Sequence, residues 1–374
     1  MADSDDSTRG TIVVLGATGY TGRLAVDALL RRGIRPVVAG RKVDHISQVA
    51  RDLGDLEARV ADASDPDSVR QLVSSGDVLL TTVGPFDLFG HGVAEAAASA
   101  GAHYVDSTGE IGFIREVTRR WDSLARETGS TMVPAFGYDY VPGILAGALA
   151  LAEAPEATAL RVGYFATGDP LWKGLSQGTR TTVAEGLTLP TTVWRNGRFT
   201  DVRMAAGVAS FPVHGRPRKG FLVSGSEVLY FPPAHPALQT VEVFNGWFPG
   251  LSRAVQGATK LANAVARNDA GAKVVKRASR VIVGPAGGPD LAERARTRTH
   301  VVALAQGGGD RTLAEVHVEG PSIYSLTGEL LALASDLLAS GASREAGVLG
   351  PIEAFGLDTL ESTCAAVGLQ RTPV

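Results

Sequence analysis

A glycine-rich heptapeptide near the start of the chain has the residue types and spacing of a phosphate-binding turn. It reads Gly16-Ala17-Thr18-Gly19-Tyr20-Thr21-Gly22 and follows the apolar run Ile12-Val13-Val14-Leu15. In such a turn the first glycine permits a tight bend, the second lets the backbone approach a pyrophosphate, and the third lets the next helix pack closely on the sheet. The helix N-terminus adds N–H groups that attract the diphosphate. The pattern predicts a dinucleotide site made by these seven residues, and a fold that has lost its ligand is the alternative.

Two basic residues at the end of the next apolar run predict which dinucleotide binds. A site that prefers NAD usually has Asp or Glu there, about 20 residues after the glycines, to bind the ribose 2′-hydroxyl. Here the run 36–39 ends in Gly40-Arg41-Lys42, without a carboxylate. Arg41 can grip a 2′-phosphate bidentately and stack beneath the adenine, with Lys42 as a second cation. We therefore predict that NADPH binds better than NADH, and a solvated basic helix start is the alternative.

Three further segments follow predicted strands and are candidates for cofactor contacts. Asp62 is placed to accept from the adenine amino group or, equally, to cap a helix. The turn Val83-Gly84-Pro85-Phe86 is expected against the ribose and nicotinamide, because open α/β sheets hold ligands at the carboxyl ends of their strands. A purely structural turn is the alternative. Thr108, with Gly109 beside it, is placed to hold the carboxamide.

Four residues are candidates for the chemical step. Asp106 could orient a substrate amine or bind a water, although the following Ser107-Thr108-Gly109-Glu110 resembles a helix capping box. Tyr138 or Tyr140 could donate the proton that accompanies hydride addition, or could pack as a hinge aromatic. Lys173 could face the substrate or lie on the surface with its stem packed.

The remaining histidines and the single cysteine do not predict a metal. His91 begins a helix and is either a proton relay or merely solvated. Four others share no metal-ligand spacing: His214, His235, His300 and His317. Cys364 is the only cysteine, so it forms no internal disulfide and cannot complete a thiolate shell.

Composition excludes several classes of protein. The chain has 374 residues and a net charge of −3, with 36 Lys+Arg against 39 Asp+Glu. That balance gives no general attraction to nucleic acid or anionic membranes. The acidic N-terminus lacks the features of a secretion signal, and the most apolar helical run, 141–152, is far shorter than the roughly 20 residues of a membrane span. We expect a cytoplasmic protein.

The order of predicted elements gives the fold class. Short apolar runs alternate with amphipathic segments up to about residue 134, which predicts a six-stranded doubly wound parallel sheet of the Rossmann type. Strands are expected at 11–15, 36–39, 58–61, 78–82, 103–105 and 131–133. The second half contains two hairpin signals, Asn196-Gly197 and Gly307-Gly308-Gly309-Asp310, and predicts an α+β domain with a mixed, mainly antiparallel sheet. A helix is expected at 325–338 and another near 357–367. The predicted ranges are a disordered tail at 1–10, the Rossmann domain at 11–140, the second domain at 141–350 and a C-terminal helical segment at 351–374 that packs back on the first.

Five motifs taken together resemble the saccharopine dehydrogenase-like oxidoreductases, most nearly the branch that includes trans-acting enoyl reductases. They are the glycine turn, Ala39-Gly40-Arg41, Val83–Phe86, His103–Glu110 and Ala135-Phe136-Gly137-Tyr138-Asp139-Tyr140-Val141-Pro142. The family's usual Asp after the last proline is missing, and Gly143-Ile144 stand there instead. The resemblance implies NADP(H), a catalytic or dimerisation domain, and hydride transfer to a C=C or C=N bond of a small or carrier-bound substrate.

Two other functions remain open at this point. An amino-acid dehydrogenase of the saccharopine type would need cations for substrate carboxylates, with Arg180 and Lys173 as candidates. A redox sensor would bind NADP without turning it over. We also expect a homodimer, and the segment 244–248, Phe-Asn-Gly-Trp-Phe, predicts an exposed apolar patch that would line a substrate channel or the dimer interface.

Overall fold

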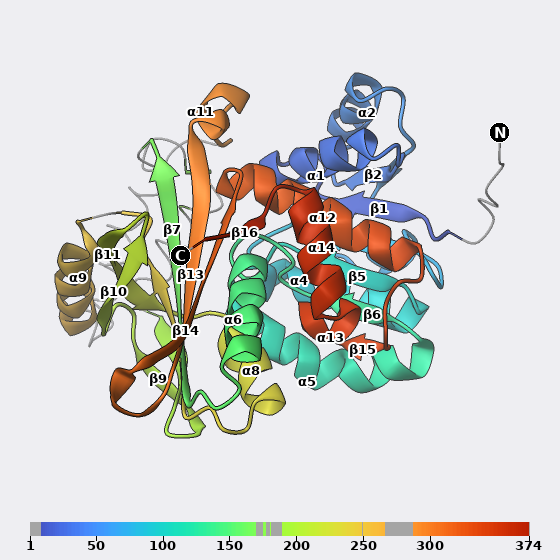
Figure 1. Ribbon diagram of the computed structural model, residues 1–374. Coiled ribbons are helices and arrows are strands. Elements are labelled where there is room, and N and C mark those ends of the chain that lie inside the picture. The colour runs from blue at the N-terminus through green and yellow to red at the C-terminus, as the bar shows by residue number, and fades with distance from the viewer. Residues whose placement is uncertain are drawn as a thin grey trace. The chain divides into compact units, whose positions relative to one another are not determined.

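The computed structural model describes residues 9–169, 175–176, 180, 189–248, 250–265 and 287–373. They belong to two compact units (Figure 1). The first, here called the Rossmann unit, comprises Met1–Val141 and Tyr324–Val367, and the second unit comprises Pro142–Ile323 and Gly368–Val374. The predicted disordered tail lies almost wholly outside the described residues.

The Rossmann unit is built on a seven-stranded parallel sheet in the order β15-β6-β5-β4-β1-β2-β3. The strands are short, and β1, β2, β4 and β6 are buried along their whole length, as expected for a sheet covered on both faces. Six of them confirm the predicted strands: β1 (Ile12–Leu15), β2 (Val37–Gly40), β3 (Ala58–Val60), β4 (Val78–Thr81), β5 (His103–Asp106) and β6 (Thr131–Val133).

The helices of this unit connect the parallel strands. They are α1 (Tyr20–Arg31), α2 (Val43–Asp52), α3 (Pro66–Arg70), α4 (Phe86–Ala100) and α5 (Ile111–Thr128). The chain proceeds from β1 outward to β3 and then returns to the other side of β1 at β4. Right-handed crossovers therefore place α1 and α2 on one face and α4 and α5 on the other. The reversal between β1 and β4 is the topological switch point, at which open sheets of this kind hold their ligands.

Residues far along the sequence complete the Rossmann unit. Its late elements are α12 (Ile323–Ala339), β15 (Gly347–Val348), α13 (Pro351–Phe355) and α14 (Leu357–Ala366). Helix α12 crosses α1 so closely that a Cβ on Gly328 would lie 2.9 Å from the backbone of Leu24. Glu329 also pairs with Arg31 at 2.7 Å. The helix predicted at 325–338 is thus present. The predicted second domain, 141–350, included this helix, but its close crossing with α1 places it in the Rossmann unit.

The second unit contains a nine-stranded mixed sheet, in which the pairing of β12 with β7 is the one parallel pair among the described strands. The order is β10-β11-β12-β7-β13-β14-β16, with β8 on β12 and β9 on β8. Its strands are β7 (Ala159–Gly168), β8 (Pro190–Arg195), β9 (Arg198–Arg203), β10 (Val208–Val213), β11 (Arg216–Val223), β12 (Thr240–Asn245), β13 (Thr297–Gln306), β14 (Thr312–Gly320) and β16 (Gln370–Thr372). Its described helices are α6 (Val141–Glu153), which starts at the boundary, α8 (Glu227–Ala234), α9 (Ser252–Val265) and α11 (Leu291–Ala295). The predicted fold class is confirmed.

Two-residue turns set the register of the hairpins in this sheet. Asn196 and Gly197 have φ values of 51° and 69°, the left-handed pair that a tight hairpin requires, and the predicted hairpin is present. A second turn of the same kind joins β10 to β11, and there the first residue is His214, with φ 50°. The second predicted hairpin, formed by β13 and β14, is also present.

The expected exposed patch at 244–248 is wrong. Phe244 is 4% exposed and Trp247 is 8% exposed. The Phe244 ring packs on Phe211 with ring centroids 5.5 Å apart, inside a core that also includes Phe165. Phe244 is therefore part of the sheet's own core. Among the described residues, no helix has both the length and the apolar character that crossing a bilayer demands.

Candidate functional site

The glycine turn closes tightly between β1 and α1. Gly16 has φ +92°, and its N–H donates to the carbonyl of Ala39 at 3.0 Å. The N–H of Gly19 donates back to the carbonyl of Gly16 at 2.9 Å. A Cβ on Gly22 would lie 2.3 Å from the Gly16 carbonyl oxygen, and one on Gly16 would lie 2.8 Å from Oγ1 of Thr82. The first and third glycines are therefore required by the backbone packing itself.

The start of α1 is open to an anion. Gly19 is its N-cap and supplies no side chain to the first-turn N–H groups, and no acidic residue lies in that turn. Thr18 and Gly19 are exposed, whereas Ala17 is buried and can offer only its backbone. Uncapped N–H groups at an accessible helix start fit a diphosphate, because the anion supplies the missing acceptors. Thr21 and Gly22 stand in that first turn. Tyr20 packs edge-on against Tyr324, with ring centroids 5.4 Å apart.

The end of β2 lies beside this turn and carries the predicted cations. A Cβ on Gly40 would lie 3.6 Å from Cγ2 of Thr18. Arg41 and Lys42 follow, both exposed, and Lys42 is the N-cap of α2. The backbone that leads into the two predicted cations thus lies next to the glycine turn, and their contact with a 2′-phosphate remains a prediction.

Asp62, just after β3, is held by its neighbour Ser64. One carboxylate oxygen accepts from the N–H of Ser64 at 2.9 Å and from its hydroxyl at 2.7 Å. These hydrogen bonds are the main cause of the lowered pKa of Asp62, and the positive charge of Arg41 lowers it further. The cap of the following helix α3 is Asp65, which accepts from the N–H groups of Asp67 and Ser68. The helix-cap alternative for Asp62 is therefore wrong, and its contact with adenine remains a prediction.

The segment after β4 is divided between surface and core. Gly84 is exposed, and Val83 and Pro85 are partly exposed. Phe86 is buried and packs on Phe113, with ring centroids 5.6 Å apart. Its side chain therefore belongs to the core, so its predicted cofactor contact can be made only by the backbone.

Glu110 caps the helix that begins at Phe86. Its two carboxylate oxygens accept from the N–H groups of Phe86 and Asp87, each at 2.9 Å. The capping-box interpretation is wrong for α5, the helix that Glu110 precedes, because no side chain caps it there; Glu110 caps α4 instead. This contact ties the end of β5 to the start of α4.

Asp106, at the end of β5, is fully buried. One carboxylate oxygen accepts from the N–H groups of Thr108 and Ala135, both at 2.8 Å, and Ala135 has φ 62°. Burial is the main cause that raises the pKa of Asp106 to about 6. Thr108 is buried as well, and its hydroxyl accepts from the N–H of Glu110 at 3.1 Å. Because both side chains bind backbone, the geometry favours a structural role for Asp106 and leaves Gly109 as the accessible member of the pair 108–109.

The two tyrosines after β6 are packed inside the Rossmann unit. Tyr138 is 2% exposed and Tyr140 is 4% exposed. The hydroxyl of Tyr140 donates to the carbonyl of Gly109 at 2.7 Å, and the N–H of Tyr138 donates to Oγ1 of Thr327 at 3.3 Å. These contacts favour the alternative in which both are packed aromatics.

Asp139, between these tyrosines, is a candidate that the sequence reasoning missed. Its side chain is exposed, and a carboxylate oxygen lies 3.2 Å from the position of a Cβ on Gly109. Surrounding protein limits the hydration of the carboxylate and raises its pKa to about 6. The available signal was that Asp139 is the only charged residue in the motif from 135 to 142.

Residues 12–133 match the family described as the saccharopine dehydrogenase NADP binding domain. The predicted family resemblance and the predicted cofactor, NADP(H), are confirmed for this domain.

Similar proteins were found both by sequence and by structure. The chain is 37% identical over 140 residues to a trans-acting enoyl reductase of Mycobacterium ulcerans (strain Agy99), which is 36% of this chain and 34% of that protein. It is 32% identical over 150 residues to a lipid droplet localized protein of Caenorhabditis elegans, covering 37% and 35%. The chain thus spans about a third of the length of the curated relatives it matches. A solved saccharopine dehydrogenase (L-Glu forming) from Saccharomyces cerevisiae has the same fold, with a TM-score of 0.62, 15% identity, and coverage of 98% of this chain and 100% of that one.

One of the four predicted catalytic residues, Lys173, lies outside the described residues, so its role stays a prediction. His91 is half-buried against Phe113, with ring centroids 5.1 Å apart. It is therefore not the merely solvated histidine that was the alternative to a proton relay. The arrangement that the described residues do bring together is a cofactor cradle made by the glycine turn and the ends of β2, β3 and β4.

Proposed function

We propose that this protein is an NADPH-dependent oxidoreductase that adds a hydride to an activated C=C bond, such as that of an enoyl thioester. The observation that carries the proposal is the open, glycine-lined start of α1 beside the exposed Arg41. A C=C bond is chosen because relatives that are 36–37% identical to this chain over 140 residues are named trans-acting or putative trans-acting enoyl reductases. Reduction of a C=N bond, as in the saccharopine-type alternative, is a separate outcome of the test below.

The residues of the cradle have distinct tasks in this proposal. When bound, NADPH supplies the hydride, and the protein orients it and limits access of water. The N–H groups of the turn and of the first turn of α1 hold the diphosphate. Arg41 binds the 2′-phosphate, assisted by Lys42, and the exposed Gly84 lets the cofactor approach the end of β4.

We assign the proton that accompanies hydride addition to Asp139. The carbon or nitrogen next to the one that receives the hydride must be protonated, which requires an acid that solvent or substrate can reach. Asp139 is exposed and has a pKa raised to about 6, so a useful fraction is protonated near neutral pH. Tyr138 and Tyr140 are buried, and the Tyr140 hydroxyl already donates to Gly109. Their packing fixes the backbone that carries Asp139.

The reaction class is tested by following NADPH oxidation with three groups of substrates: enoyl thioesters, cyclic imines, and keto acids supplied with an amine. The proposal expects turnover of enoyl thioesters. Turnover confined to imines or to keto acids with amine would move the function to C=N reduction. Tight NADPH binding without turnover of any of the three substrate groups would refute the proposed enzymatic activity and favour the redox-sensor alternative.

The role of Asp139 is tested with the variant Asp139→Asn, using the substrate that is turned over. A protonated donor predicts that kcat falls as pH rises through about 6. Asp139→Asn should lower kcat by roughly 10²-fold or more and abolish that pH dependence, since general acids contribute about 10²–10⁴-fold. The control is Asp358→Asn, an exposed acid in the first turn of α14. A wild-type pH profile retained in Asp139→Asn would refute the assignment.

A further inference from the structure

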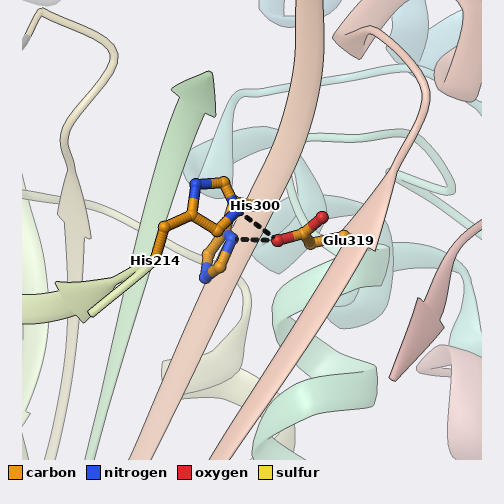
Figure 2. Close-up of side chains that lie close together, drawn as sticks. All are labelled: His214, His300 and Glu319. Carbon is orange, nitrogen blue, oxygen red and sulfur yellow. Dashed lines mark hydrogen bonds and ion pairs between the residues drawn. The ribbon is translucent and has the colours of Figure 1, made fainter. Parts of the chain in front are cut away.

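A group of histidine and glutamate side chains gathers in the second unit, which contains none of the residues assigned to NADPH. Nε2 of His214 lies 2.5 Å from Oε1 of Glu319, and Nδ1 of His300 lies 2.7 Å from the same oxygen (Figure 2). The three ligand atoms lie within 4.8 Å of one another. Figure 2 shows both imidazole rings turned toward the one carboxylate.

The sheet register explains why these residues meet although they are far apart in the sequence. His300 on β13 is paired directly with Glu319 on β14. Alternate residues of a strand share a face, so Glu315, His317 and Glu319 all project to one side of β14. His214 reaches the same place from the turn between β10 and β11. Sequence spacing predicted no metal here because the spacing that matters is across strands.

A second layer of contacts fixes the orientation of His300. Its Nε2 lies 3.0 Å from Nδ1 of His317, and Nε2 of His317 lies 2.8 Å from a carboxylate oxygen of Glu315. Ligating histidines commonly use their second ring nitrogen in this way, which sets the tautomer and the angle of the ring. His317 therefore holds the His300 ring through the nitrogen that does not face Glu319.

The series of contacts from Glu319 to Glu315 is one proton short when both imidazoles are neutral. Glu319, His300, His317 and Glu315 make three successive contacts, and each contact between two lone-pair atoms needs one proton. Two neutral imidazoles bring only two. A cation at Nδ1 of His300 leaves the two available protons for the other two contacts.

We propose that His214, His300 and Glu319 bind one divalent transition-metal ion of the Zn²⁺ type. A proton can link two atoms, but here three donors converge, which is the donor set of a His₂Glu site with a fourth position left for water. Imidazole nitrogens exclude Mg²⁺ and Ca²⁺ as the preferred ions, since those take oxygen ligands.

The site can accept the ion with little rearrangement. Neighbouring ligands in a tetrahedral zinc shell are about 3.3 Å apart, given bonds of about 2.0–2.1 Å. Each histidine nitrogen must therefore move roughly 0.6–0.8 Å from Oε1 of Glu319. His214 is exposed and lies on a turn, so it can move and leave the site open to solvent. Its φ of 50° lies in the left-handed region that such a turn requires.

The test uses the full chain, with any affinity tag removed, after dialysis against a chelator. Calorimetric titration with Zn²⁺, and absorption spectroscopy with Co²⁺, should give one equivalent bound and the visible d–d bands of a low-symmetry cobalt site. The decisive variant is His214→Asn, because asparagine suits the turn and leaves the fold intact while removing the imidazole. Affinity should fall by at least tenfold in this variant and in Glu319→Gln.

Two more variants distinguish the residues that bind the ion from the residues around them. His317→Gln should weaken binding by about 10- to 100-fold, the usual effect of removing an orienting partner. His235→Ala is the matched control, since this half-exposed histidine of the second unit lies outside the group, and it should bind like the wild type. Less than 0.2 equivalents of Zn²⁺ or Co²⁺ bound by the wild type, or equal affinity in His214→Asn, would overturn the proposal. None of these readouts depends on the oxidoreductase activity.

Discussion

Replacing Arg41 tests the coenzyme preference most directly. Arg41 is exposed and directly follows Gly40, the last residue of β2, which lies beside Thr18 of the glycine turn. Hydrogen bonds from a charged group contribute about 1.5–3 kcal/mol, and the exposure of Arg41 places it at the lower end. Arg41→Ala should therefore raise the Kd for NADPH by about tenfold, because about 1.4 kcal/mol corresponds to a factor of ten. The Kd for NADH should not change, since NADH lacks the 2′-phosphate.

Arg41→Asp should have a larger effect than Arg41→Ala. A carboxylate near the 2′-phosphate adds repulsion of about 1 kcal/mol per charge pair at 4 Å in water. The total, about 2.5 kcal/mol, predicts a weakening of NADPH binding by roughly 70-fold, while the new carboxylate can accept from the 2′-hydroxyl of NADH. Both Kd values can be measured by calorimetry at fixed ionic strength. Arg51→Ala, which removes another exposed cation from α2, is the charge-matched control. An unchanged ratio of the two Kd values in Arg41→Ala would refute the reasoning.

Three further variants test the packing. Gly22→Ala should abolish measurable NADPH binding, because the new Cβ would lie 2.3 Å from the Gly16 carbonyl oxygen and distort the turn; calorimetry would detect any retained affinity. Burial raises the folded-state pKa of Asp106 above its ordinary value, so its contribution to the unfolding free energy falls as pH rises from about 4 to about 6. Asp106→Asn keeps an acceptor for both N–H groups and should reduce that pH dependence in urea melts, whereas an unaltered slope would contradict it. Gly143→Ala should lower the melting temperature by several degrees, because its Cβ would lie 2.0 Å from the buried Tyr164 hydroxyl.

The sequence predicted the parts of the fold that depend on local signals. The alternation of short apolar runs with amphipathic segments located the first six strands of the parallel sheet. Asn196-Gly197 predicted a hairpin because few residue pairs adopt two successive left-handed conformations. Asp65 and Pro66 carry a local signal of the same kind, because an Asp cap followed by proline at the first helical position is typical of a helix start.

What the sequence could not predict depends on contacts between distant residues. β15 has only two residues, which carry no periodicity, and becomes a strand because Gly347 and Val348 pair with β6. The group around Glu319 exists only through strand register. Asp106 and Glu110 were ambiguous for a related reason, since a carboxylate at the end of a strand can face a ligand or a nearby N–H group. In the structure both carboxylates accept from N–H groups, and three of those four N–H groups belong to residues outside the segment 103–110.

The Rossmann unit is made of two separate stretches of the chain, so its sheet can be completed only late in synthesis. Strand β6 acquires its outer neighbour β15 only after residues 142–323 have been synthesised. At about 5–20 residues per second, that delay is on the order of 10–40 seconds on the ribosome. During this interval one edge of a hydrophobic sheet has its hydrogen-bonding groups unmatched, a state prone to intermolecular association. Chaperone dependence and the yield of soluble protein should therefore be more sensitive to changes in residues 324–367 than the small size of β15 suggests.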